Sequence, residues 1–346
     1  MNTSRLMRNI SATAMILSLA ACMGATTPGG PTPGGAQPAK TFIPPLKGMT
    51  STDYQALQNR KVIGKDGERT EFTSFATSEN NDTTFNGPVG RTTGAIVISS
   101  GETDGDTTKI PTIFYAFGRN SDNGTSHNPD YGNRTYPDGS STIEGGQESI
   151  NGQRVYVGQK RPAGGYTHVL YIPRGDSQMY AGAYVRDEIG AGAHGVFGRK
   201  TTASELGIIT GSANYKGAAA ASVSRYDGVT DAESGLYEGE TTANLNFNVN
   251  TITINGTVSR DHEYSAGRDT IGIRSSGTFD ANGKIVGTTT FDGLSANGKV
   301  ATGNFQGNFF GPKGQTIGGT FIGGSSATAA GPQEALIVGH TIMNKN

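Results

Sequence analysis

The stretch FFGPKGQTIGGTF, residues 309–321, alternates bulky rings with residues that have no side chain. Before and after the GPKGQ turn, every second position carries either a large apolar side chain or a glycine. Glycine leaves room for a neighbouring ring and lets a strand bend sharply. The stretch therefore predicts two adjacent strands of a narrow, strongly curved sheet. The residues expected on its concave face are Phe305, Gly307, Phe309, Ile317, Gly319 and Phe321.

A second alternating segment lies upstream, at residues 243–259. There Leu245, Phe247 and Val249 alternate with asparagines, which is typical of a strand with one buried face. The apolar positions then shift to Ile252 and Ile254. Such a shift predicts a two-residue hairpin turn at residues 250–251, because residues flanking such a turn point to the same face.

Further turn signals follow at short intervals towards the C-terminus. Asn-Gly pairs at residues 282–283 and 297–298 separate three more runs of β-forming residues. From about residue 207 to the end, the pattern yields roughly eight hairpin-connected strands, the number that closes into a small barrel filled by side chains. We predict an all-β chain with a C-terminal eight-stranded antiparallel up-and-down β-barrel over residues 193–346.

Residues 47–192 contain less regular strand patterns and predict an N-terminal β-rich domain. Its clearest segments are GAIVISS, IPTIFYAFG, QRVYVGQ, YTHVLYIPR and MYAGAYVR. Between this region and the predicted barrel, GAGAHG at residues 190–195 has the G-x-G-x-x-G spacing of a dinucleotide-binding loop. No helical apolar stripe follows it, so we interpret it as a β-turn linker between the two domains.

The first residues are typical of a processing signal. Arg5 and Arg8 precede an apolar run that is too short to cross a bilayer and ends in LAAC at Cys22, the one cysteine of the chain. This end looks like a bacterial lipobox, which predicts a signal peptide over residues 1–21 and a lipid-modified Cys22. The Pro/Gly-rich residues 22–46 then form a tether. We expect an outer-membrane, lipid-anchored protein at the cell surface.

Composition and motifs exclude several function classes. Lys plus Arg number 28 and Asp plus Glu number 29, a balance unlike that of nucleic-acid-binding proteins. The sequence contains no G-x-S-x-G, H-E-x-x-H or C-x-x-C motif and no recognisable pair of catalytic carboxylates. We expect no enzyme, no catalytic residues, no metal site and no required cofactor.

Three stretches resemble the β-barrel domain of the transferrin-binding protein B family. They are GSANYKG at 211–217, LNFNVNTITING at 245–256 and GNFFGPKGQTIGGTF at 307–321. GVFGRKTTASEL, residues 195–206, resembles the entry into the same barrel. The resemblance implies that residues 47–192 form a handle domain. The chain has one barrel-like region where transferrin-binding protein B has two lobes, so it looks more like the single-lobe relatives, several of which bind haem or haemoproteins.

The resemblance implies a surface lipoprotein that binds haem, a haemoprotein or an iron carrier and delivers it to a TonB-dependent outer-membrane transporter. The alternative is an adhesin or an immune-evasion lipoprotein that binds a host protein. An outer-membrane pore is disfavoured, because the sequence lacks tryptophan and ends in Asn346 rather than an aromatic residue.

Candidate ligand-binding residues lie in the long polar stretch 119–141. It carries His127, Tyr131 and Tyr136 among Asn, Asp, Gly and Ser, and long polar loops in compact domains are often functional. Haem, if it is the ligand, needs an axial side chain such as histidine, and the candidates are His127, His168 and His194. His340, in the last predicted strand, is interpreted as a structural residue.

Overall fold

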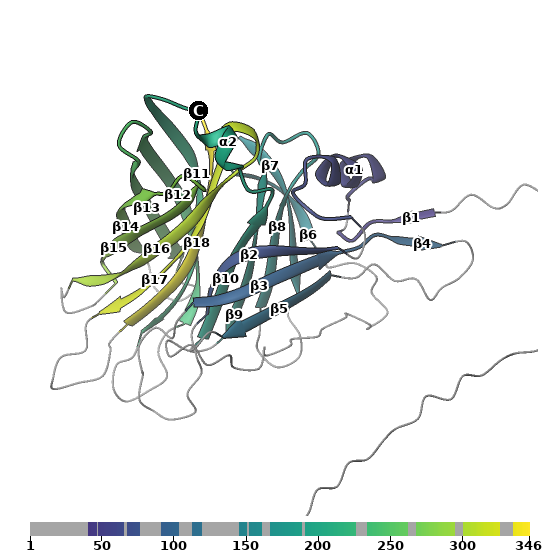
Figure 1. The fold of residues 1–346 in the computed structure, drawn as a ribbon. Coiled ribbons are helices and arrows are strands. Elements are labelled where there is room, and N and C mark those ends of the chain that lie inside the picture. The colour runs from purple at the N-terminus through teal and green to yellow at the C-terminus, as the bar shows by residue number, and fades with distance from the viewer. Residues whose placement is uncertain are drawn as a thin grey trace, which may run out of the picture. The chain divides into compact units, whose positions relative to one another are not determined.

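A computed structural model provides the structure of the chain. It describes residues 41–46, 48–65, 68–76, 91–103, 113–119, 145–150, 152–160, 167–188, 191–225, 234–261, 268–294, 300–325 and 335–346. These residues form three β-structures: a two-stranded sheet, an eight-stranded sheet and a closed eight-stranded barrel. The predicted all-β fold with an antiparallel up-and-down barrel is therefore confirmed (Figure 1).

The barrel closes by pairing each strand with the next and the last with the first, in the order β11-β12-β13-β14-β15-β16-β17-β18. All its pairings are antiparallel. The bounds are β11 Ser212–Arg225, β12 Ser234–Asn246, β13 Thr251–Asp261, β14 Arg268–Phe279, β15 Lys284–Asp292, β16 Ala301–Phe310, β17 Thr316–Ser325 and β18 Ala335–Lys345.

The eight-stranded sheet precedes the barrel in the chain and has the order β5-β3-β2-β10-β9-β8-β7-β6. The sequence predicted five of these strands, namely β3, β5, β7, β8 and β9. The bounds are β2 Arg69–Ala76, β3 Arg91–Ile98, β5 Ile113–Arg119, β6 Gly145–Ile150, β7 Gln153–Lys160, β8 Thr167–Pro173, β9 Ala181–Glu188 and β10 Ala191–Gly198. The two-stranded sheet pairs β1 (Thr41–Ile43) with β4 (Gly101–Thr103).

The barrel interior is built from rings lying over glycines, as the opening stretch predicts. Phe305 pairs with Phe321 across β16 and β17. A Cβ added to Gly319 would lie 2.3 Å from the Phe305 ring, and one added to Gly339 would lie 2.2 Å from the Phe321 ring. Each ring thus occupies the space that a neighbouring side chain would need. This arrangement lets a barrel of eight strands enclose several phenylalanines at interior packing density.

Two local predictions were wrong. The turn between β12 and β13 has four residues, Phe247–Asn250, because Asn246 pairs with Thr251 and Asn250 takes a positive φ of 54°. The stretch 190–195 was interpreted as a turn linker, yet from Ala191 onward it belongs to β10, in the interior of the sheet between β9 and β2. Its glycines and alanines lack the branched side chains that mark a strand in a sequence.

Two barrel strands, β17 and β18, are buried on both faces. Their inward side chains join the barrel core, while their outward side chains meet β10 and its neighbours in the sheet. Val196 of β10 packs against the outer surface at Gly318, and Ile342 of β18 joins the same apolar cluster. The outer surface of the barrel is therefore buried rather than exposed to water on this side. We call this contact between the sheet and the barrel the seam.

Helices are few and short, and their ends are capped. Helix α1 (Ser51–Asn59) begins with a capping box, in which Thr50 and Asp53 bond each other's backbone amides. Tyr156 also donates a hydrogen bond to Asp53 (2.7 Å), which fastens the helix to β7. A second capping box opens α2 (Ala203–Leu206), and a short 3-10 turn, η1 (Pro312–Gly314), joins β16 to β17. No helix within the described ranges has the length and apolar character needed to cross a membrane.

The seam contains a matched pair of buried threonines on β17. The hydroxyl of Thr320 has no hydrogen-bond partner within the described structure, whereas the hydroxyl of Thr316 accepts from Tyr180 N and donates to Asn344. We expect Thr320→Val to leave the free energy of unfolding unchanged or raise it by about 1 kcal/mol, because it removes an unpaired buried hydroxyl. The control Thr316→Val should lower it by about 1–3 kcal/mol. Urea denaturation measures the free energy of unfolding of both variants. Equal losses of stability would contradict the conclusion that Thr320 is unpaired and Thr316 is hydrogen-bonded.

Candidate binding surface

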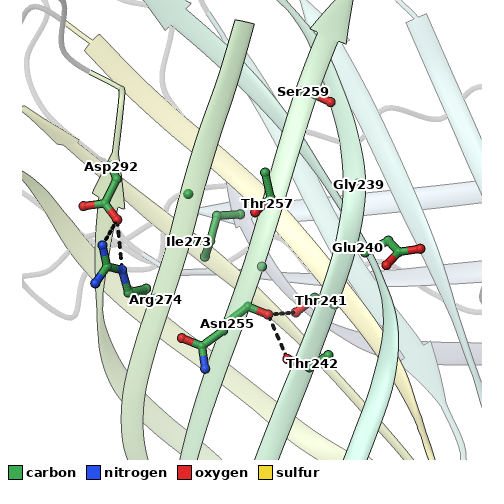
Figure 2. A pocket seen from close by; sticks show the side chains of 12 residues that line it. Gly239, Glu240, Thr241, Thr242, Asn255, Thr257, Ser259, Ile273, Arg274 and Asp292 are labelled. Atoms are coloured by element: carbon green, nitrogen blue, oxygen red, sulfur yellow. Dashed lines mark hydrogen bonds and ion pairs between the residues drawn. The ribbon is translucent and has the colours of Figure 1, made fainter. Parts of the chain in front are cut away.

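The outer wall of the barrel over β12–β15 carries ordered rows of polar side chains. One row runs across four strands through Glu240, Thr257, Gly272 and Asp292, which are register neighbours. Apart from Gly272, its members are exposed, because the apolar partners of these strands point into the barrel. Figure 2 shows Glu240, Thr257 and Asp292 on separate strands of the wall.

The row has a gap at Gly272, where the outward position carries no side chain. An open concavity of about 780 Å³ lies over this part of the wall. Two further glycines, Gly239 and Gly256, belong to its lining and contribute only backbone there. On the outer face, the concavity lies where Gly272 leaves a gap in the row, whereas Gly239 and Gly256 are register partners of the buried Val258, Thr241 and Ile273. Its lining residues are Gly239, Glu240, Thr241, Thr242, Asn255, Gly256, Thr257, Ser259, Gly272, Ile273, Arg274 and Asp292.

Charges of both signs border the concavity. Arg274 Nε donates to Asp292 Oδ2 at 2.9 Å and its Nη2 contacts the same oxygen (Figure 2). This pair is exposed and contributes little stability, since such surface pairs are worth roughly 0–1 kcal/mol. Glu240 lies 3.8 Å from Lys216 Nζ and is 74% exposed. These groups remain hydrated and available to hydrogen-bond a polar partner.

The chemistry of the concavity suits a hydrated polar surface better than a porphyrin. Its twelve lining residues include no histidine, tyrosine, methionine or cysteine, the side chains that hold haem iron. Carboxylates, a guanidinium, an amide and hydroxyls are instead the groups found at the polar rims of protein–protein interfaces. Sequence reasoning missed this surface, because the role of Gly272 depends on its strand register with Thr257 and Asp292.

The structure places His194 in the seam rather than at a surface. Its side chain is fully buried, its Nδ1 lies 3.0 Å from His340 Nδ1, and its Nε2 contacts the Ser222 hydroxyl at 2.9 Å. Both ring nitrogens are therefore engaged, a geometry unsuited to an axial iron ligand. His340 is 4% exposed, in agreement with a structural residue.

The other predicted site residues are only partly covered by the structure. His168 lies in β8, where its backbone pairs with those of Lys160 and Arg186, and its side chain is outside the described part. Cys22 and the loop residues His127, Tyr131 and Tyr136 also lie outside the described residues. Their roles stay predictions. Within the described ranges, no group of three or more His, Cys, Asp or Glu side chains could hold a metal ion.

A family comparison covers most of the barrel. Residues 209–338 match the family model described as "C-lobe and N-lobe beta barrels of Tf-binding protein B". The matched range begins just before β11 and ends within β18, so it contains almost the whole barrel. It also contains the concavity residues, from Gly239 to Asp292.

Solved structures of transferrin-binding protein B are similar to the chain at low identity and low TM-score. Transferrin Binding Protein B from Haemophilus parasuis Hp5 (mutant Trp-176-Ala) is 9% identical over 80% of this chain and 75% of its own, with a TM-score of 0.38. The intact Ap-TbpB, with N and C lobes, is 8% identical over 80% and 77%, with the same score. The Neisseria meningitidis serogroup B protein is 9% identical over 81% and 64% (TM-score 0.38).

These structural likenesses are too distant to carry an argument, and no curated protein matches the chain. The family model is the finding that tests the predicted resemblance, because it aligns the barrel strands themselves. The predicted resemblance is confirmed for the barrel: residues 209–338 are similar to the barrels of Tf-binding protein B.

Proposed function

We propose that this chain is a lipid-anchored surface protein that binds an iron-bearing protein and passes its cargo to a TonB-dependent outer-membrane transporter. The lipobox at Cys22 and the Pro/Gly-rich tether support the anchor. The match of the barrel to Tf-binding protein B supports the class of ligand. The anchor, the cell-surface location and the transporter are parts of this proposal.

The concavity on the barrel wall is the main support for a protein ligand. It is polar, open and bordered by exposed charges, and its lining offers no axial ligand for haem. A protein partner can bury such a surface through hydrogen bonds and water-mediated contacts. Free haem would need an apolar slot with a histidine or tyrosine beside it.

A variant that fills the concavity tests this proposal. A Cβ added to Gly272 meets only the Asp292 side chain, 3.3 Å away, so Gly272→Tyr should fold normally. We expect it to weaken capture of the iron-bearing protein from serum by about tenfold, the effect of losing roughly 1.4 kcal/mol of contact energy. The matched control is Thr278→Tyr, an exposed position on the same strand at the hairpin end.

The two variants divide the outcomes. Capture lost in Gly272→Tyr and kept in Thr278→Tyr supports a site on this wall. Capture that is equal in both variants moves the site elsewhere on the molecule. If haemin gives a Soret band and no serum protein is retained, the ligand is haem rather than a protein.

Growth on a single iron source separates uptake from adhesion. A deletion strain should fail to grow on the iron-loaded ligand and recover when the wild-type gene is restored. Normal growth of that strain, combined with reduced attachment or reduced resistance to serum, would establish the adhesin or immune-evasion alternative. An adjacent gene for a TonB-dependent receptor would support uptake.

A further inference from the structure

The seam holds a pair of buried histidines that the binding function does not use. His194 comes from β10 of the sheet and His340 from β18 of the barrel. Their Nδ1 atoms lie 3.0 Å apart and their ring centroids 5.3 Å apart. Both are buried in the seam, His194 at 0% and His340 at 4% exposed.

The hydrogen bonds determine how the two rings carry their protons. The backbone N–H of Ser222 donates to His194 Nε2 at 3.2 Å, so that nitrogen must be an acceptor without a proton. A neutral His194 therefore carries its proton on Nδ1 and donates it to His340 Nδ1. His340 in turn must carry its proton on Nε2.

Each ring has one nitrogen left to protonate, and each protonation changes the hydrogen bonds that the nitrogen makes. A proton on His194 Nε2 would face the N–H of Ser222 at 3.2 Å, and only the Ser222 hydroxyl, 2.9 Å away, could accept it. A proton on His340 Nδ1 would face the N–H of His194 across 3.0 Å. Either event buries a positive charge in a dry environment, where an unmatched charge is costly.

The surroundings provide little compensation for a positive charge. The His340 ring lies beside Tyr171 of β8, with centroids 5.7 Å apart, and the Tyr171 hydroxyl donates to Glu238 of β12 at 2.5 Å. Thr320, the cross-strand neighbour of His340, is uncharged. Among the described contacts of the two rings, none is with a carboxylate. Glu238 accepts from Tyr171 rather than from a histidine.

Burial fits the neutral state of both rings. It lowers the pKa of His340 from 6.5 to about 3. Burial, together with the adjacent His340, also lowers the pKa of His194 well below 6.5. Both histidines have a lower pKa in the closed seam than they would have when exposed to water. The closed seam is therefore fully stable above about pH 6.5, and it loses stability as the pH falls below that value.

We propose that this histidine pair makes the seam acid-sensitive: protonation below about pH 6 separates β10 from β18 while the barrel stays closed. The barrel is held by its own strand pairing and by an interior cluster that excludes both histidines. The seam depends instead on side-chain contacts, among them the packing around Val196, Phe310 and Ile342 and the hydrogen bond from Tyr180 N to Thr316. At pH 5, His340 alone lowers the equilibrium constant for the closed seam about 30-fold, and His194 acts in the same direction.

Single-tryptophan reporters can test this in the full chain, which contains no natural tryptophan. Tyr180→Trp places a reporter at the seam, where this side chain lies against Gly311, and Phe279→Trp places one in the barrel interior. Between pH 7.5 and 5 we expect the seam reporter to shift its emission to the red while the barrel reporter does not. The comparison is the same reporter in His194→Gln/His340→Asn, which keeps an acceptor near each bonded nitrogen and cannot titrate.

In that non-titrating variant the seam reporter should show no shift over the same pH range. The proposal is overturned if the seam reporter is insensitive to pH, if its shift persists in the variant, or if both reporters move together. Imidazole NMR shifts of the wild-type chain provide a second measurement that needs no substitution at the pair. Protonation of the two rings must coincide with the red shift, and protonation without it would also overturn the proposal.

Discussion

Phe321→Ala should lower the free energy of unfolding by about 3–5 kcal/mol, the range for removing a fully buried phenylalanine. Phe321 is 1% exposed, and its ring lies over Gly339 and 5.8 Å from the ring of Phe291. Gly339 has no side chain that could move into the space. The neighbouring rings are confined by the curved wall, so the cavity should collapse only in part.

Urea denaturation at pH 7.5 measures this loss, with Val286→Ala as the control. Val286 lies on the outer face of β15 and is 40% exposed, so its truncation should cost about 0.5 kcal/mol or less. A loss below about 1.5 kcal/mol for Phe321→Ala would mean that the interior repacks freely. The ring-over-glycine arrangement would then not be what determines this barrel.

That arrangement is also the part of the fold that the sequence predicted best. Alternation of Phe and Gly near residues 305–321 indicated paired curved strands, and the register Phe305–Phe321 bears this out. Period-two patterns are readable because one face of each strand is apolar and the other polar. Where both faces are buried, as in β17 and β18, the pattern disappears, and nothing local indicates that a second sheet covers them.

Other features were hidden for different reasons. Strand β10 is composed largely of glycine and alanine in its first half, so intrinsic β-propensity did not reveal it. Helix α1 could have been predicted from its capping residues Thr50 and Asp53. The contact between His194 and His340 joins residues 146 positions apart, and only the three-dimensional fold brings them together.

The candidate site was the least predictable element. Sequence reasoning favoured histidines and tyrosines because those side chains have distinctive chemistry. The concavity depends instead on Gly272, an absent side chain whose importance appears only when the register places it between Thr257 and Asp292. Surfaces formed by missing atoms have no motif.

Gly318 provides the strongest direct test of the seam. It faces the sheet from β17, and a Cβ at this position would lie 2.4 Å from Val196 Cγ1 and 3.0 Å from the Phe310 ring. Val196 is branched at Cβ and fully buried, so it cannot turn away easily. We expect Gly318→Ala to lower the free energy of unfolding by about 1–3 kcal/mol, and Gly318→Leu to lower it by about 3 kcal/mol or more.

A double-mutant cycle identifies the cause of the loss. Val196→Ala alone should cost about 2 kcal/mol, because it removes buried methyl groups. Combined with Gly318→Ala it should cost less than the sum, with a favourable interaction of about 1 kcal/mol or more, because the new methyl group occupies the space vacated by Val196. Strictly additive losses would show that the two side chains do not meet. The sheet and the barrel would then not be joined at this point, and the histidine pair beside it would lose its structural basis.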